Sequence, residues 1–207
     1  MRCLRLLPIV VLLIGVFSPP SEAATKFTAQ DRTDIRRIEA YLNNFKSLRS
    51  NFIQVSSDQY SEGVIYIERP NKLRLKYTNP SHIQVYSSGF WLTYIDKELE
   101  AIWHVPIRST AASLFVRENI KLSGDVFLQR VKREPGVISI VLRQTENQSS
   151  GSLELIFADN PLMLRKWNIL DGDGIATSVT LLSAEFDITI PSSTFSFEET
   201  EYEYQSD

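Results

Sequence analysis

The sequence predicts a mainly β protein with a few helices, built on one antiparallel meander of about eleven strands. Short segments rich in β-branched and aromatic residues follow one another from residue 51 onward, and Gly, Pro, Asn or Asp stands between them. One amphipathic segment precedes them, and a second segment of helical composition interrupts them once. A sheet of that many strands must curl or close, because otherwise it exposes a long edge.

The first 23 residues have the pattern of a secretory signal peptide. Arg2 and Arg5 form a basic start, residues 6–17 are almost wholly apolar, and Ser21-Glu22-Ala23 places small residues at a cleavage site. The apolar stretch is short for a membrane-spanning helix, although a membrane anchor is the alternative. We therefore expect an exported protein in which residues 24–207 form a single domain, since no repeat or long linker divides them.

Charge and cysteine content narrow the possible partners. The chain has 22 Lys and Arg against 25 Asp and Glu, a net charge of −3, which argues against nucleic acid as a partner. Cys3 is the only cysteine and would leave with the signal peptide. The mature chain would then have no disulfide and would depend on its own hydrophobic core.

The amphipathic segment predicts one helix directly after the signal peptide. Thr28 and Asp31 have the spacing of a capping box, with Asp in place of the usual Glu or Gln. An apolar stripe follows at three- and four-residue spacing: Ile35, Ile38, Leu42 and Phe45. Leu48 and Phe52 would extend this stripe, but residues 51–55 already have the composition of a strand.

The strands are predicted from alternation and from the turn residues between them. Their expected ranges are 51–57, 62–68, 72–77, 82–87, 90–95, 98–104, 126–132, 137–144, 152–158, 162–170 and 175–190, the last of these bent or split. The interruption, residues 109–117, has Ala111, Leu114 and Phe115 at helical spacing. It predicts a short helix, which is either a connector capping the open end of the sheet or a movable lid over an apolar cavity.

Alternation over residues 72–77 separates two faces. Three basic side chains share one face, and Leu73, Leu75 and Tyr77 share the other. If the turn at Pro70-Asn71 preserves the alternation, Arg69 lies on the apolar face, where an unpaired charge is costly. Arg69 would then use main-chain carbonyls, for example those at the end of the 109–117 helix. The alternative is a half-exposed arginine paired with a nearby Glu.

Several strands carry large apolar residues on both faces. This pattern predicts either a sheet that is buried on both faces or an apolar cavity. On the cavity interpretation, the inward lining would include these side chains: Leu73, Leu75, Tyr77, Ile83, Val85, Trp91, Trp103, Leu114 and Phe115. Nothing in the sequence indicates an enzyme, a metal site or a cofactor. His82 and His104 both fall on predicted strands, and no phosphate loop or nucleophile elbow is present. A secreted enzyme with catalytic groups drawn from distant residues is the open alternative.

The chain resembles the LolA family of periplasmic lipoprotein carriers over most of its mature length. The most specific stretch is Gly63 together with residues 67–74, Ile-Glu-Arg-Pro-Asn-Lys-Leu-Arg. Phe52 and Gln54 match the family's Phe-x-Gln element, and residues 88–94 resemble its following hairpin, with Ser88 in place of Asp. The strands around residues 151–157 and 167–171, and Phe195-Ser196-Phe197, resemble the family's later strands, whereas the short acidic C-terminus departs from them. The resemblance implies an unclosed antiparallel β-barrel with helices in its concave side.

The resemblance also implies a function. A periplasmic monomer would bind the acyl chains of lipoproteins released by an inner-membrane ABC transporter and deliver them to an outer-membrane acceptor. Arg69 would hold the lid closed in the empty protein, and no cofactor or nucleic acid would take part. A lipid-binding protein or sensor that carries a different amphiphile on the same fold is the alternative.

Overall fold

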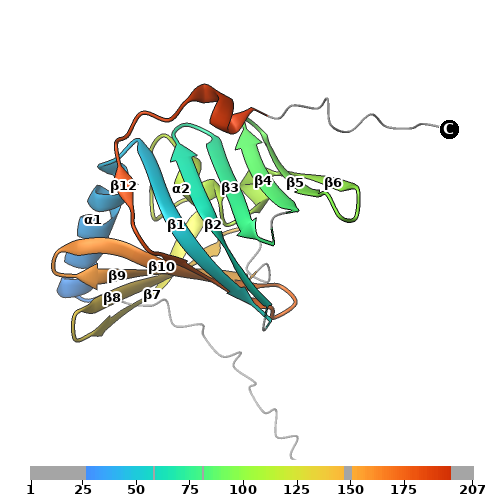
Figure 1. Cartoon of the computed structure of the whole chain (residues 1–207). Helices are drawn as coiled ribbons and strands as arrows, with labels where there is room; N and C mark the ends of the chain where they lie inside the picture. Colours follow the sequence, from blue (N-terminus) through green and yellow to red (C-terminus); the bar gives the residue numbers. More distant parts are fainter. Residues whose placement is uncertain (1–26, 58, 81, 147–150, 197–207) are drawn as a thin grey trace, which may run out of the picture.

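The computed structural model describes residues 27–57, 59–80, 82–146 and 151–196, and shows a 12-stranded antiparallel sheet that curls without closing (Figure 1). Its strand order is β6-β5-β4-β3-β2-β1-β11-β10-β9-β8-β7, and β12 pairs separately with β1. The predicted mainly β fold, with an unclosed barrel and helices, is confirmed. The predicted signal peptide and the acidic residues 197–207 lie outside the described residues.

The elements follow the predicted order. The strands are β1 (Ser47–Ser56), β2 (Gln59–Glu68), β3 (Lys72–Asn79), β4 (Ile83–Ser88), β5 (Trp91–Asp96), β6 (Ala101–Pro106), β7 (Val126–Glu134), β8 (Val137–Gln144), β9 (Gly151–Asp159), β10 (Leu162–Asp171), β11 (Ala176–Leu181) and β12 (Glu185–Phe186). The helices are α1 (Ala29–Asn43), η1 (Ile107–Ser109), α2 (Ser113–Val116) and η3 (Ser192–Phe195).

Helix α1 begins as predicted and ends earlier than its apolar stripe. The Thr28 hydroxyl accepts the Asp31 main-chain N–H at 3.1 Å, and the Asp31 carboxylate accepts the Thr28 N–H at 2.7 Å, which completes the capping box. Phe45 was expected on the helical stripe but lies beyond the last residue, Asn43, where it is nevertheless buried. The helix stops because strand β1 starts at Ser47 and pairs with β2 from there.

The start of one predicted strand needs correction. The strand expected at 98–104 is β6 and starts only at Ala101, because residues 97–100 form the β5–β6 turn. The Asp96 carboxylate accepts the N–H groups of Glu98 and Leu99 at 3.0 and 3.2 Å, which fixes this turn. The segment expected at 175–190 as bent or split is split as expected, into β11 and the short β12.

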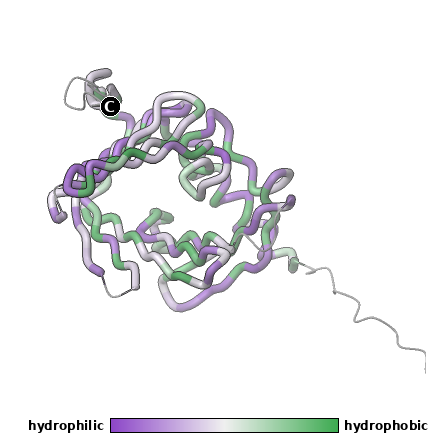
Figure 2. The backbone as a smooth tube through the Cα atoms, turned by 90° about the vertical axis from the view of Figure 1, so that its right-hand side faces the viewer, coloured by the Kyte–Doolittle hydropathy of each residue, from purple (hydrophilic) through white to green (hydrophobic). Residues whose placement is uncertain are grey.

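The core lies inside the curl, where α1 and α2 pack against the inner face of the sheet. Ile38 and Leu42 of α1 and Leu114 and Phe115 of α2 belong to one buried cluster that includes residues from most strands. Figure 2 shows the backbone as a ring around this interior. Gly63 lets β2 and β3 approach closely, since a Cβ there would lie 2.2 Å from the Lys76 carbonyl oxygen.

Candidate functional site

The side chain of Arg69 lies inside the curl and joins the two helices. Its Nε donates to the Phe115 carbonyl in α2 at 2.9 Å, and its Nη1 donates to the carbonyls of Leu42 and Phe45 at 2.6 and 3.0 Å. The guanidinium also stacks on the Phe45 ring, 4.4 Å from its centroid. The bond to the short helix was expected, whereas the two bonds to the end of α1 were not.

No carboxylate pairs with Arg69 among the described residues, so the alternative of a surface ion pair is wrong. The nearest candidate, Glu68, instead pairs with Lys72 at 2.6 Å. Burial lowers the pKa of Arg69 to about 10, and Asp187 opposes this shift only partly. Because that value is still well above neutral, the group stays charged, and its Nη2 is buried without a hydrogen-bond partner among the described residues. Main-chain carbonyls, the Phe45 ring and the attraction of Asp187 stabilise this charge in place of a paired carboxylate.

The turn after Arg69 makes a second connection to α2. The Asn71 N–H donates to the Val116 carbonyl at 2.8 Å, and the Gly89 N–H donates to the Asn71 carbonyl at 3.1 Å. Asn71 has a φ of +63°, a left-handed conformation that Asn tolerates better than most residues. The β2–β3 turn therefore occupies two C-terminal carbonyls of α2, which a short helix leaves free. We call residues 107–117, which contain η1 and α2, the lid segment.

Most of the predicted lining residues lie together on the inner face. Five of them belong to the buried core, and two are partly buried against it: Leu73, Tyr77, Val85, Leu114 and Phe115 in the first group, Leu75 and Ile83 in the second. The Tyr77 hydroxyl donates to the Gln54 side chain at 3.0 Å, and burial raises the pKa of Tyr77 to about 12. These side chains pack against one another, and whether they bind a ligand stays a prediction.

The two tryptophans among the predicted lining residues behave differently. Trp103 pairs with Tyr94 across β5 and β6 and shares the inner face, but it is 48% exposed because β6 is an edge strand. Trp91 lies on the outer face, since its neighbour Leu92 packs against the core and successive strand residues alternate. The expectation that Trp91 lines the interior is therefore wrong. Because β5 carries apolar residues on both faces, the sequence does not indicate which face points inward.

A cavity that was not predicted from the sequence lies between the lid segment and strands β7 to β10. It has a volume of about 430 Å³ and an apolar lining from α2 and from β7 to β10: Leu114, Val126, Leu142, Leu153, Ile169 and Leu170. Its rim is charged and includes Arg108, Arg117 and Asp125. A second cavity of about 530 Å³ shares these three residues and extends to Asn71 and Phe90. The lid segment thus has open space on two sides.

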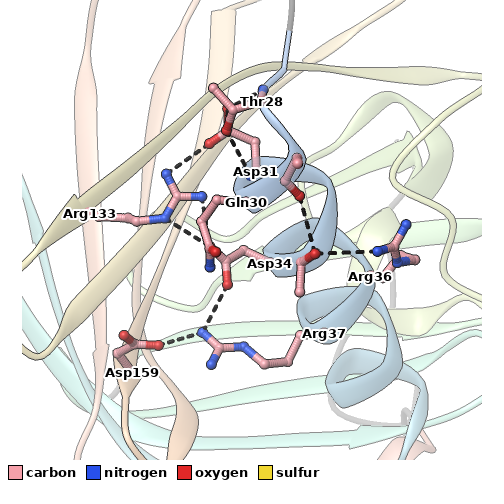
Figure 3. A network of polar contacts seen from close by, with 10 residues as sticks. Thr28, Gln30, Asp31, Asp34, Arg36, Arg37, Arg133 and Asp159 are labelled. Atoms are coloured by element: carbon pink, nitrogen blue, oxygen red, sulfur yellow. Dashed lines mark hydrogen bonds and ion pairs between the residues drawn. The ribbon is translucent and has the colours of Figure 1, made fainter.

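The first half of α1 is fixed by an ion-pair network (Figure 3). Arg133 of β7 contacts Asp34 at 2.6 Å and Asp31 at 2.8 Å, and Arg37 joins Asp34 to Asp159 at the end of β9. Asp34 is only 3% exposed, so its charge depends on these arginines. The network joins the first half of α1 to β7 and to the end of β9. The C-terminal end of α1 contacts Arg69 instead. We call these five residues the α1 clamp.

Two searches of the described residues gave negative results. No cluster of His, Cys, Asp and Glu in this part of the chain is arranged to hold a metal ion. None of its helices is long and apolar enough to cross a membrane.

Comparison with known proteins gave consistent matches. The family model of the outer membrane lipoprotein carrier protein LolA matches residues 43–198. An outer-membrane lipoprotein carrier protein of Methylococcus capsulatus is 31% identical over 108 residues, which are 49% of this chain and 48% of that protein, so this match spans about half of the relative. One from Pseudomonas fluorescens is 26% identical over 193 residues, covering 86% of this chain and 91% of its own. The solved LolA superfamily protein of Nitrosomonas europaea has a TM-score of 0.45 at 8% identity and covers 79% of this chain and 97% of its own.

Proposed function

Because the chain belongs to the outer membrane lipoprotein carrier family, LolA, we propose that it is a periplasmic carrier of acylated lipoproteins. On this proposal, it takes lipoproteins released by a transporter at the inner membrane and delivers them to an acceptor at the outer membrane. Residues 1–23 are its signal peptide and residues 24–207 its single carrier domain. It binds its cargo without chemistry, as a monomer.

The observation that carries the proposal is the contact of Arg69 with both helices over an apolar interior. Acyl chains enter an interior lined by Leu73, Phe115 and their neighbours only if α2 moves off the sheet, and this breaks the bond from Arg69 to the Phe115 carbonyl. Inserted acyl chains then take over the contacts that the core side chains make with one another. On this proposal, the arrangement with α2 packed against the sheet is the closed state of the cycle.

The cost of opening the lid reduces the free energy that loading gains. Burying about ten methylene groups gains ~8 kcal/mol at ~0.8 kcal/mol each. Opening breaks the bond from Arg69 to the Phe115 carbonyl, worth ~1.5–3 kcal/mol for a charged donor, and the bond from Asn71 to the Val116 carbonyl, worth ~1 kcal/mol. Opening therefore offsets part of the gain from loading. The cargo stays transferable to a more apolar acceptor without an energy source, which a carrier requires.

Substitution of Arg69 tests the proposal. Arg69→Leu removes the bonds that favour the closed state and adds apolar surface, so the variant should take up lipoprotein but release it poorly. Arg69→Lys should be intermediate, because Lys keeps the charge but lacks the planar fork. Arg49→Leu is the matched control, since Arg49 forms an exposed ion pair with Glu185 at 2.8 Å. The assay measures uptake from donor membranes and then transfer to the acceptor as separate steps.

Normal transfer by Arg69→Leu would show that Arg69 has no part in release. Native mass spectrometry of the protein purified from its own periplasm identifies the cargo. An acylated peptide supports the lipoprotein carrier. A free lipid without peptide would instead favour a carrier or sensor of another amphiphile on the same fold.

A further inference from the structure

The two free edges of the sheet differ in how they are protected against pairing. Edge strand β7 has a bulge between Leu128 and Arg130 and carries Arg130, Lys132 and Arg133, all of which hinder the addition of another strand. Edge strand β6 has a regular register with β5 and contains no Lys, Arg, Asp or Glu. Two of its apolar side chains, Trp103 and Val105, are 48% and 41% exposed. Only one edge is open to a further strand.

The hydrogen-bond pattern shows which groups of β6 are available. The Ile107 N–H donates to the Phe90 carbonyl of the neighbouring chain segment at 2.9 Å. Main-chain groups of an antiparallel strand point alternately to either side, so residues 105, 103 and 101 also face β5. The N–H and C=O groups of Ile102 and His104 therefore point to the free edge, together with the carbonyl of Pro106.

The free edge of β6 is continuous with the apolar interior and with the lid segment. Trp103 pairs with Tyr94 and Val105 with Leu92, and both partners pack against the core. The lid segment follows directly after Pro106. A peptide added along β6 would place its first residue beside the interior, where acyl chains attached to that residue could insert.

From these observations we infer that β6 binds the peptide that follows the acylated residue of the cargo, as an added strand. This inference rests on the proposed carrier function. Main-chain pairing recognises any extended peptide, which suits a carrier of cargoes that differ in sequence. Glu98 and Glu100 stand immediately before β6, and the Glu98 side chain is 73% exposed. This acidic end favours a basic residue in the bound peptide.

A pair of substitutions at one position isolates the main-chain contact. His104→Pro removes the N–H that points to the free edge and keeps the bonds to β5, because Pro is tolerated on an edge strand with that orientation. His104→Ala keeps the N–H and is the control for loss of the imidazole, which contacts Thr93 at 2.9 Å. The probes are tripalmitoylated cysteine amide and the same lipid amino acid followed by a short peptide of Ser and Lys.

In the wild type and in His104→Ala, the peptide should raise the affinity over the amide by about tenfold, the effect of two ordinary main-chain hydrogen bonds. In His104→Pro, which loses one of these bonds, the gain should fall to about threefold or less while the amide binds unchanged. N-methylation of alternate residues of the peptide probe should likewise reduce its advantage in affinity over the amide. This test uses the wild-type protein, so it remains decisive if His104→Pro does not fold. Hydrogen exchange at the Ile102 and His104 amides should slow with the peptide probe and not with the amide.

The outcomes separate the two proposals. If neither probe binds, the carrier function itself fails. If both bind equally, or His104→Pro keeps the gain, the added strand is wrong and the carrier function stands. Dimers that His104→Pro disrupts would assign the edge to a second copy. Faster exchange at Ile102 and His104 after deletion of residues 197–207 would assign it to the chain's own C-terminus. Either of these results overturns the inference.

Discussion

Ile169 and Leu73 differ in how well they can report on ligand binding. Leu73 is 3% exposed within the packed core, so a charge there would destabilise the fold as well as block a ligand. Ile169 is only partly buried and lines the cavity of about 430 Å³. A charge at Ile169 can reach the cavity mouth when the cavity is empty and becomes costly when acyl chains fill it.

We expect Ile169→Glu to lower lipopeptide uptake by about tenfold or more, because an acyl chain cannot cover the carboxylate without desolvating it. Leu182→Glu is the control, since Leu182 is 54% exposed. Competition between lipopeptide and the apolar dye bis-ANS measures uptake. Equal uptake by both variants would place the acyl chains away from this cavity, under the β2–β4 half of the sheet.

Single residues were predictable from sequence where alternation was strict. Leu73 and Tyr77 alternate with three basic residues, so their side of β3 was clear, and Arg69 followed from the same parity. Trp91 was placed on the wrong side because its strand is apolar on both faces. The bonds from Arg69 to the end of α1 join residues 24 and 27 positions apart in the chain, and no local pattern reports a contact of that kind.

The ion pairs of the α1 clamp decide how firmly helix α1 is held. Arg133→Met removes both contacts to the helix and leaves the buried Asp34 with fewer partners. We expect a loss of ~1–3 kcal/mol in the free energy of unfolding, less than for a fully buried ion pair, because the Arg133 side chain is 38% exposed and Arg37 still contacts Asp34. Arg130→Met, an exposed position on the same strand, should change it little. Urea unfolding measures both variants, and equal stabilities would show that the clamp contributes nothing.

The clamp also predicts how stability depends on pH. Hydrogen bonds from the main chain and side chain of Thr28, and then from Arg133, lower the pKa of Asp31 from 3.8. A carboxyl with a lowered pKa in the folded state stabilises the fold above its unfolded value, and this stability is lost as the pH falls through the folded value. The free energy of unfolding should therefore decrease below about pH 4. Asp31→Asn should weaken that decrease, and an unchanged profile would contradict the assignment.

Element boundaries were predictable except where tertiary contacts set them. Most strands lie within a few residues of their expected ranges because alternation and turn residues mark them locally. Strand β6 starts late because the Asp96 side chain fixes the preceding turn, and α1 ends early because β1 pairs from Ser47. The cavity beside the lid segment was missed since it depends on how α2 and β7–β10 pack in three dimensions.

The two halves of the sheet hold the two helices by different kinds of contact. The α1 clamp fixes α1 to the β7–β10 half, whereas the lid segment is joined to the β2–β3 turn by the bonds of Arg69 and Asn71. Loading should therefore move α2 and leave α1 in place, because three ion pairs join α1 to β7 and β9, whereas only main-chain carbonyls receive the bonds from Arg69. The open space on both sides of the lid segment leaves room for this movement.

Hydrogen exchange in the empty and loaded protein tests this movement without any substitution. The Asn71 N–H donates to the Val116 carbonyl of α2, whereas the N–H of nearby Arg69 donates to the Lys46 carbonyl between α1 and β1. If α2 leaves the sheet, lipopeptide should speed exchange at Asn71 and leave Arg69 protected, which makes Arg69 an internal control. If both amides stay protected in the loaded protein, α2 does not move. The acyl chains would then bind in the cavity already present between α2 and β7–β10, and Arg69 would be a fixed support of the core.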